Sequence, residues 1–122
     1  MLEADYMQAV AVASGAAKRY LAAVARRATS RDLVDLVMET RDRWAAVEMV
    51  CALGEDAAQT RISELPWRHT RKTCHAAWLD ARHWAVRAED ASARCQMAAA
   101  LIQAHLGEAP TQPMPPRSLR SV

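Results

Sequence analysis

The sequence predicts an all-α protein, an antiparallel bundle of three long helices with a short connecting helix and a proline-rich tail. Three observations support this fold class. About a fifth of the 122 residues are alanine, the strongest helix former. Only three residues are glycine, so few positions suit the tight turns that join strands. Apolar residues recur at alternating spacings of three and four, which is the repeat of one face of a helix.

The first two helices are predicted over residues 3–28 and 31–53. The apolar face of the first helix consists of Tyr6, Val10, Ala13, Ala17, Tyr20 and Val24. Thr29 can cap the second helix, with Asp32 three residues later as in a capping box. Its inward face consists of Leu33, Val37, Thr40, Trp44, Val47 and Cys51. Gly54 stands where a C-terminal cap would end this helix.

Residues 55–65 are predicted to form a short helix or a linker, and Pro66 suits the first turn of the helix after it. The absence of glycine and proline from residues 67–106 predicts one long helix there. Its inward seam consists of Cys74, Trp78, Ala81, Ala85, Ala88, Ser92, Cys95, Ala99, Ile102 and Leu106. An alternative is a break near Glu89, after which the chain would fold back as a fourth helix.

The third helix would be roughly 60 Å long and the preceding hairpin roughly 35–40 Å, at 1.5 Å per residue. The third helix would therefore overhang the hairpin and leave apolar residues without an intrachain partner, as at a protein–protein contact. These residues are Cys95, Ala99, Leu101 and Ile102. Trp44 and Trp78 are expected in the core. Trp84 lies off the centre of the seam, so an interface and the edge of the core are both open for it.

Residues 1–107 are the predicted helical domain, and the proline-rich residues 108–122 are expected to be disordered. The acidic start lacks the basic region of a signal peptide, and the longest uncharged early run is too short to span a bilayer. The three cysteines show no paired spacing, which favours a reducing compartment. A cytoplasmic protein without a membrane partner is expected.

Charges are strongly segregated along the chain, although the net charge is only +2. Residues 32–56 hold seven acids and two bases, a net charge of −5. Residues 57–87 hold six bases and two acids, a net charge of +4. At about 100° per residue, the bases of this segment fall mainly on one side of the third helix. This basic stripe consists of Arg68, Arg71, Lys72, His75 and Arg82.

Arg19 and Arg26, seven residues apart on the first helix, form a second and smaller basic patch. Arginines one turn apart can contact successive phosphates of a nucleic acid, which gives affinity independent of sequence. The alternative is that the stripe is only a solvated face. The pI of about 8.6 is mild for a protein that binds nucleic acid on its own, so a subunit of a larger assembly fits better.

No catalytic, metal or cofactor site is predicted. Cys74 and His75 are adjacent, so on a helix their side chains diverge by about 100° and cannot share an ion. Asp80 and His83 resemble half of a di-iron bundle site, but the Glu-x-x-His motifs that complete such a site are absent. The isolated glycines exclude a phosphate-binding loop. A non-enzymatic protein is therefore expected.

Arg68 and His75, with six residues between them, resemble the Arg–His motif that HEPN-type ribonucleases carry on a helix at a dimer interface. His69 occupies the place after the arginine where that family commonly has a polar residue. The resemblance implies an alternative function, RNA cleavage that depends on His75.

The small size, the helical composition and the stripe Arg68–Arg71–Lys72–Arg82 without a catalytic motif resemble the small helical-bundle subunit of multi-protein CRISPR effector complexes. The resemblance extends over residues 1–107. It implies a structural subunit that stacks along the complex, with protein neighbours and a guide RNA or target strand as partners. Self-association is a further expectation. The competing hypothesis is a protein-interaction bundle or adaptor without a role in nucleic-acid binding.

Overall fold

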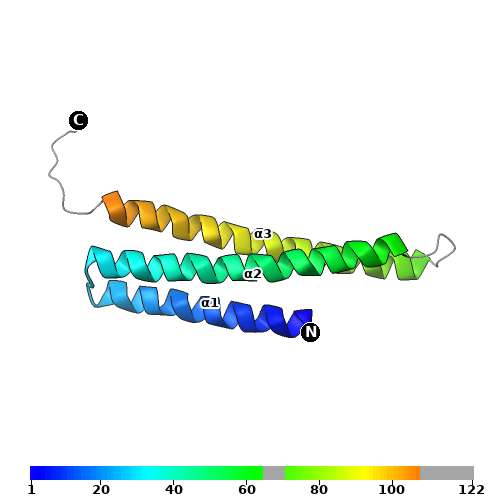
Figure 1. Cartoon of the computed structure of the whole chain (residues 1–122), viewed down its shortest axis with the longest axis horizontal. Helices are drawn as coiled ribbons and strands as arrows, with labels where there is room; N and C mark the ends of the chain where they lie inside the picture. Colours follow the sequence, from blue (N-terminus) through cyan, green and yellow to red (C-terminus); the bar gives the residue numbers. More distant parts are fainter. Residues whose placement is uncertain (65–70, 108–122) are drawn as a thin grey trace, which may run out of the picture.

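The computed structural model of the chain describes residues 1–64 and 71–107, and the elements within these ranges are three helices and no strand. They are α1 (Leu2–Ala25), α2 (Ser30–Glu64) and α3 (Arg71–Gly107). The helices lie side by side with α2 in the middle, and each runs back along the one before it (Figure 1). The all-helical prediction is confirmed. The predicted tail and Pro66 lie outside the described residues.

Helix α1 ends in a Schellman motif that uses an arginine where glycine is usual. Arg27 adopts a positive φ of 60°. Its N–H donates to the carbonyl oxygen of Val24 at 3.1 Å, and the N–H of Ala28 donates to that of Ala23 at 3.0 Å. These bonds satisfy carbonyl groups at the end of the helix. Because a side chain in the left-handed region is strained, this turn is held at a cost to stability.

Helix α2 begins at the predicted cap. The Oγ1 atom of Thr29 accepts a hydrogen bond from the N–H of Asp32 at 3.1 Å, so the capping part of the prediction is confirmed. The N-terminal acid also complements the dipole of the helix.

The predicted end of the second helix at Gly54 is wrong, because α2 continues to Glu64 without interruption. Residues 55–64 therefore belong to α2 and do not form a separate connecting helix. Gly54 is buried against Trp84 of α3. A Cβ atom at residue 54 would lie 2.6 Å from Cε2 and 2.7 Å from Cε3 of that ring. The glycine serves close packing between helices and not chain termination.

The third helix is a single helix without a break near Glu89. Because α2 is longer than predicted, α2 and α3 have nearly equal lengths of 35 and 37 residues, and α3 does not overhang α2. Both extend instead beyond α1, which has 24 residues (Figure 1). Of the apolar residues expected to lack an intrachain partner, Cys95 and Ile102 find one, whereas Ala99 and Leu101 remain exposed. Ile102 is buried in a cluster with Val37 and Ala98.

The core follows a seven-residue repeat in each helix, as in coiled coils. In α2 the buried positions are Val37, Thr40, Trp44, Val47, Cys51, Gly54 and Ala58. This register is the one predicted for residues 37–51. The main cluster joins Trp44 and Val47 of α2 to Trp84 of α3 and Ala13 of α1.

The outer helices bury a different side from the one predicted. In α3 three neighbouring columns of residues run along the helix, each with a seven-residue spacing. The shared column, which was predicted and is buried or half-buried, consists of Ala81, Ala88, Cys95 and Ile102. The inner column, which was not predicted, consists of Ala77, Trp84, Ala91, Ala98 and His105. The outer column, which was predicted to be inward, consists of Trp78, Ala85, Ser92, Ala99 and Leu106.

The structure buries the inner column together with the shared column. Trp84 is 6% exposed, so it belongs to the core and not to an interface. Trp78, expected in the core, is 64% exposed. The same one-column shift occurs in α1, where Ala16 and Ala23 are buried and Val24 is exposed. Both columns are apolar, so the repeat alone does not distinguish them.

Candidate functional site: an open groove between α1 and α3

Helices α1 and α3 both pack on α2 but do not pack directly on each other. In residues 1–64 and 71–107, no Cα atom of one lies within 8 Å of a Cα atom of the other. Contact between α1 and α3 therefore depends on long side chains that reach across the gap. These bridges occur near both ends of α1.

The first bridge joins the start of α1 to the middle of α3. The Arg87 guanidinium donates to both carboxylate oxygens of Glu3, at 2.8 and 2.9 Å. It also lies over the ring of Tyr6, 4.0 Å from the centroid, and near the ring of Trp84 at 4.9 Å. Tyr6 meets Trp84 edge to face, with centroids 5.8 Å apart. An arginine stacked and paired in this way is well ordered.

This bridge shifts the titration of both charged partners. The hydrogen bond from Arg87 holds the pKa of Glu3 below its ordinary value. The same hydrogen bond raises the pKa of Arg87. Both shifts favour the charged forms, because each ion stabilises the other.

The second bridge joins the C-terminal half of α1 to the last turn of α3. The hydroxyl group of Tyr20 and Nε2 of His105 lie 2.7 Å apart, within hydrogen-bond distance. Their rings are in edge contact with centroids 5.8 Å apart. Tyr20 also packs against the cluster of Val37 and Ile102.

A groove of about 390 Å³ lies between α1 and α3, with α2 as its floor. The α1 wall consists of Ala17, Tyr20 and Leu21, and the floor of Val37, Thr40 and Trp44. The α3 wall consists of Asp90, Ala93, Arg94, Met97, Ala98 and Leu101. Leu21 and Met97 are 62% and 66% exposed, so the rim as well as the floor is apolar. Such a surface is typical of a binding groove.

One charged pair stands in the groove. Arg94 donates to Asp90 at 3.0 Å, and its guanidinium lies over the ring of Trp44, 4.7 Å from the centroid. Thr40 lies in the floor, where its hydroxyl donates to the carbonyl oxygen of Leu36. The polar groups of the groove therefore have partners within the chain, and the remaining lining is apolar.

The predicted basic stripe is only partly described. Arg68 lies outside the described residues, and so do the side chains of Arg71 and Lys72. His75 and Arg82 are exposed, and no ion pair joins either of them to a residue of the described ranges. The HEPN-like pair of Arg68 and His75 therefore lies partly outside the described residues.

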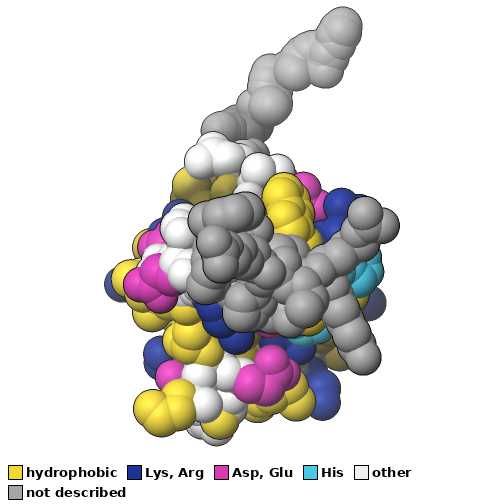
Figure 2. Space-filling model, turned by 90° about the vertical axis from the view of Figure 1, so that its right-hand side faces the viewer, with side chains coloured by type: hydrophobic (Ala, Val, Ile, Leu, Met, Phe, Trp, Pro, Cys, Tyr) yellow, Lys and Arg dark blue, Asp and Glu magenta, His cyan; other side chains and the backbone are white. Residues whose placement is uncertain are grey.

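The two arginines of the second basic patch differ in their surroundings. Arg19 donates to Glu39 of α2 at 2.7 Å, so its charge is paired within the bundle. Arg26 is exposed at the end of α1, at the end of the bundle opposite to the start of α3 (Figure 1). The fold thus does not bring Arg19 and Arg26 together with His75 and Arg82. In Figure 2, the visible Lys and Arg side chains surround the end of the molecule instead of forming one face.

The predicted interface residues are also separated. Trp84 and Ile102 are buried in the core, and Cys95 is half-buried against α2. Only Leu101 lies on an open surface, as part of the groove wall. Sequence reasoning missed Leu21 and Met97. The one sign of them in the sequence is that both are large apolar residues outside the predicted seams, which indicates an additional apolar surface.

The described cysteines are not activated. The thiol of Cys95 donates to Oε1 of Glu48 at 3.3 Å. Burial, together with this hydrogen bond, raises the pKa of Cys95 to about 11. Burial also raises the pKa of Cys51. Both are therefore thiols at neutral pH, which are weak nucleophiles and weak metal ligands.

In the described part of the chain, no group of three or more His, Cys, Asp and Glu residues is arranged to hold a metal ion. None of the helices there combines the length and the apolar character that crossing a membrane requires. Comparisons of the chain with protein-family models, with curated proteins and with solved structures find no match.

Proposed function

We propose that the protein is a non-catalytic interaction subunit of a cytoplasmic assembly, and that the groove between α1 and α3 binds an amphipathic helix of a protein partner. The observation that carries this proposal is the separation of α1 from α3, which leaves an apolar groove with a floor formed by α2. A helix laid there would complete a four-helix arrangement, with the interlocking packing seen in such bundles. Helix-in-groove binding is a common mode of peptide recognition.

The dimensions of the groove support a helical ligand. Its α3 wall runs from Asp90 to Leu101, a rise of about 17 Å or three turns at 1.5 Å per residue. Three turns suit a ligand with apolar residues at positions i, i+3 or i+4, and i+7. The side chains of Leu21 and Met97 stand on opposite walls, where they would hold the ligand from both sides. Met97 adapts easily to different apolar partners because its side chain is unbranched and flexible.

The Arg94–Asp90 pair supports a preference for the orientation of the ligand. It forms the only charged part of the lining within the described residues, so an acidic or amide side chain of the ligand could accept from Arg94. A rim contact of this kind changes specificity and the association rate more than affinity.

Site-specific photocrosslinking in the native cell tests the proposal. A benzophenone amino acid at Leu21 or Leu101 is expected to crosslink to a partner, and mass spectrometry of the adduct should identify an amphipathic helical segment. The adduct should disappear when Met97 is changed to Glu, because a carboxylate would then be buried in the apolar contact. A benzophenone on the far side of the bundle, at Ala45, is the matched control and should not capture this segment. Adducts that do not depend on Met97 would contradict the proposal.

A second candidate function is contact with a nucleic-acid backbone, as the resemblance to CRISPR small subunits implies. It is favoured by the exposure of His75 and Arg82, which form no ion pair with a described residue. Arg19, Arg61 and Arg87, by contrast, are each paired with a carboxylate of a neighbouring helix.

Gel-shift measurements with the purified chain and a single-stranded oligonucleotide test this candidate. Binding should weaken steeply with salt, and the change of Arg82 to Glu should weaken it further and reduce the salt dependence. Arg61→Glu is the control, since Arg61 is already neutralised by Asp80. Equal effects of the two changes would contradict a specific role for Arg82. Cleavage of RNA that is abolished by His75→Ala would instead favour the ribonuclease hypothesis.

A further inference from the structure

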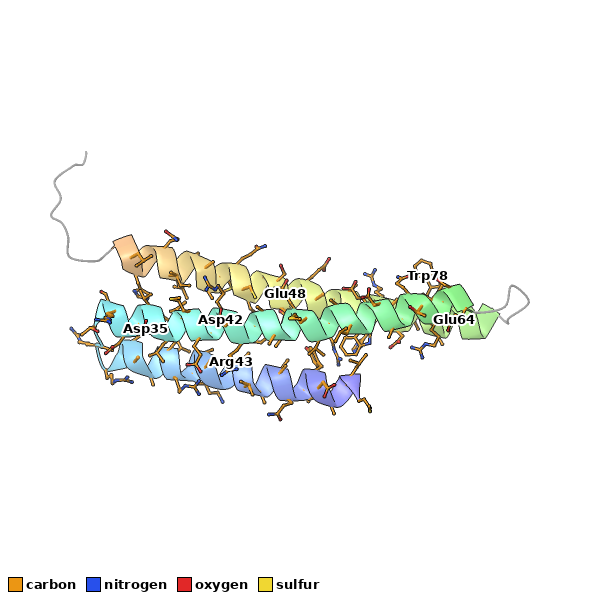
Figure 3. The ribbon with its side chains drawn as sticks, in the orientation of Figure 1. Asp35, Asp42, Arg43, Glu48, Glu64 and Trp78 are labelled. Atoms are coloured by element: carbon orange, nitrogen blue, oxygen red, sulfur yellow. The ribbon has the colours of Figure 1, made fainter. Side chains whose placement is uncertain are left out.

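A hollow of about 310 Å³ lies between α2 and α3 beside Trp78. Figure 3 shows Trp78 on the part of α3 that extends beyond α1, near Glu64 at the end of α2. None of the described residues fills the hollow, and its volume is at the lower end of the range for small-ligand sites. Its lining consists of Glu55 and Gln59 from α2 and of Trp78, Leu79, Ala81, Arg82 and Ala85 from α3.

Trp78 is the largest apolar side chain of this lining, and most of its ring is open. It is 64% exposed, whereas Trp84, less than two turns along the same helix, is 6% exposed. Tyr6 of α1 packs edge to face on Trp84, but no ring of the described residues contacts Trp78. A flat aromatic surface is therefore available to a ligand at the edge of the hollow.

Two charged groups of the lining have no ion-pair partner among the described residues. Arg82 is exposed and lies one turn from Trp78, so the two side chains are neighbours on α3. Glu55 is half-buried on the opposite wall. The other side of this helix pair differs, because there Arg61 of α2 is paired with Asp80 of α3. The hollow thus keeps a base and an acid unpaired beside an exposed ring.

We infer that the hollow binds an unpaired base of a single-stranded nucleic acid, with the base stacked on Trp78 and its phosphate on Arg82. The inference rests on the second candidate function, contact with a nucleic acid, and assigns it a base-binding site. Proteins that bind single strands combine basic surfaces with exposed aromatic side chains on which bases stack. Residues 57–87, which supply most of the lining, carry a net charge of +4, and this charge favours a polyanion.

The charges of the hollow fix the orientation of the nucleotide. One turn of α3 separates Trp78 from Arg82, a rise of about 5.4 Å, which is of the order of the distance from base to phosphate across a ribose. The carboxylate of Glu55 repels a phosphate, so the edge of the base faces α2. Glutamate accepts hydrogen bonds from the amino group of cytosine, and glutamine binds the edge of adenine. Glu55 and Gln59 therefore favour bases that carry an amino group over uracil and thymine.

A protein side chain fits the lining less well than a nucleotide. An aliphatic side chain could fill the hollow, but it would cover Arg82 and Glu55 and leave both charges without a partner, which costs free energy. A nucleotide supplies an anion for Arg82, hydrogen-bond donors for Glu55 and a flat ring for Trp78. Bases within a duplex are already paired and stacked, so a single strand is the form that presents a free base.

Fluorescence titration of the full chain with a labelled strand of about ten deoxycytidines tests the inference. Trp78→Ala should raise the dissociation constant between about fivefold and a hundredfold, because one base loses its stacking partner. Trp78→Phe should retain most of the affinity, since it keeps an aromatic ring. Leu106→Ala is the matched control, because Leu106 is another exposed apolar residue of α3 and should bind the strand like the wild type. Circular dichroism checks that each variant remains helical.

The dependence on salt separates stacking from phosphate contact. Trp78→Ala should leave the slope of log Kd against log salt concentration unchanged, because stacking releases no counterions, whereas Arg82→Glu should reduce this slope. An abasic strand of the same length carries the phosphates without the bases. It should bind the wild type and Trp78→Ala equally. An equal loss on the abasic and the normal strand would overturn stacking, since Trp78 would then act only through the shape of the protein.

The choice of ligand tests the edge and the source of the base. Oligo(dC) should bind more tightly than oligo(dT), and Glu55→Ala should remove this preference. Equal binding of both strands by the wild type would overturn the role of Glu55. The strand should also bind more tightly than cytidine monophosphate, because the mononucleotide offers one phosphate. Equal affinity for the two would overturn the single-strand assignment in favour of a free nucleotide.

Failure of the inference is distinguishable from failure of the nucleic-acid function itself. A strand that binds the wild type and Trp78→Ala equally would overturn the base site and leave backbone contact through Arg82 intact. If no strand binds and a benzophenone amino acid at residue 78 crosslinks to a protein in the cell, both are overturned in favour of a protein contact. Met97→Glu lies in the groove and should leave binding of the strand unchanged.

Discussion

The part of the bundle that α1 covers and the part that extends beyond it use the same helix pair in different ways. Trp84 and Trp78 lie less than two turns apart on α3, but Trp84 is almost fully buried and Trp78 is mostly exposed. In the covered part, Tyr6 of α1 closes the packing around Trp84. In the extension, two helices alone leave a hollow beside Trp78.

The difference shows that a pair of alanine-rich helices buries little apolar surface area by itself. Facing alanine residues bring the backbones together but supply a small apolar area, so a third helix or a partner must provide the remainder. In the covered part, α1 supplies it with two tyrosines that reach α3 across the gap. In the extension nothing within residues 1–64 and 71–107 does so, and the exposed tryptophan is the result.

Truncation of the two tryptophans should give the largest contrast. Trp84→Ala should lower the free energy of unfolding by about 3–5 kcal/mol, because it empties the centre of the main cluster. Trp78→Ala should lower it by less than about 1 kcal/mol, because most of that ring is exposed. Urea denaturation measures the free energy of unfolding of both variants. Equal losses would show that the extension is packed as tightly as the covered part.

The next largest effect is expected at the glycine beneath Trp84. Gly54→Ala should destabilise the protein by about 1–3 kcal/mol, since the added Cβ atom would overlap the Trp84 ring. Gly15→Ala is the matched control in α1. There the Cβ atom would meet only the Nη1 atom of Arg19 at 3.7 Å. The control should therefore stabilise the protein by about 0.5–1 kcal/mol through the helix preference of alanine. A gain in stability from both changes would contradict close packing at Gly54.

The outcome at Gly54 also shows what the sequence could establish about the fold. Helix content, the capping residue Thr29 and the register of α2 are local properties, and the pattern predicted them. The role of a glycine inside an apolar repeat is not local, because chain termination and close packing require the same absence of a side chain. Only the position of Trp84 on a distant helix distinguishes the two.

The site was less predictable for a related reason. Helices α1 and α3 each carry an extra apolar column, so the repeat does not decide which side faces the core. The register of α3 fixes which surfaces remain open. An error of one column therefore exchanged Trp84 with Trp78 and concealed the groove that Met97 lines. Charge patterning identified exposed bases such as Arg82, but not the carboxylate that pairs with Arg19.

A change in the turn between α1 and α2 should have a smaller effect, and of the opposite sign. Arg27→Gly should raise the free energy of unfolding by about 0.5–1 kcal/mol, because glycine adopts the positive φ of this residue without strain. The turn lets α2 run back along α1. The gain in stability therefore belongs to the part of the bundle that α1 covers. Thermal denaturation measures it. Arg26→Gly is the control, since Arg26 has a negative φ and should lose stability.

The smallest effect is expected at the boundary between the two parts, where the ion pair of Glu3 and Arg87 joins the first turn of α1 to α3. Arg87 holds the pKa of Glu3 below 4.5, so the pair stabilises the fold when the carboxylate is charged. This contribution is fully present above pH 4.5 and is lost as the pH falls through the folded-state pKa. Glu3→Gln should therefore be slightly less stable than the wild type at neutral pH, with the difference vanishing in acid. Hydrogen exchange should locate the loss in the first turns of α1 and leave the extension unchanged. A difference between the two proteins that persists at low pH would show that Glu3 acts by packing and not by charge.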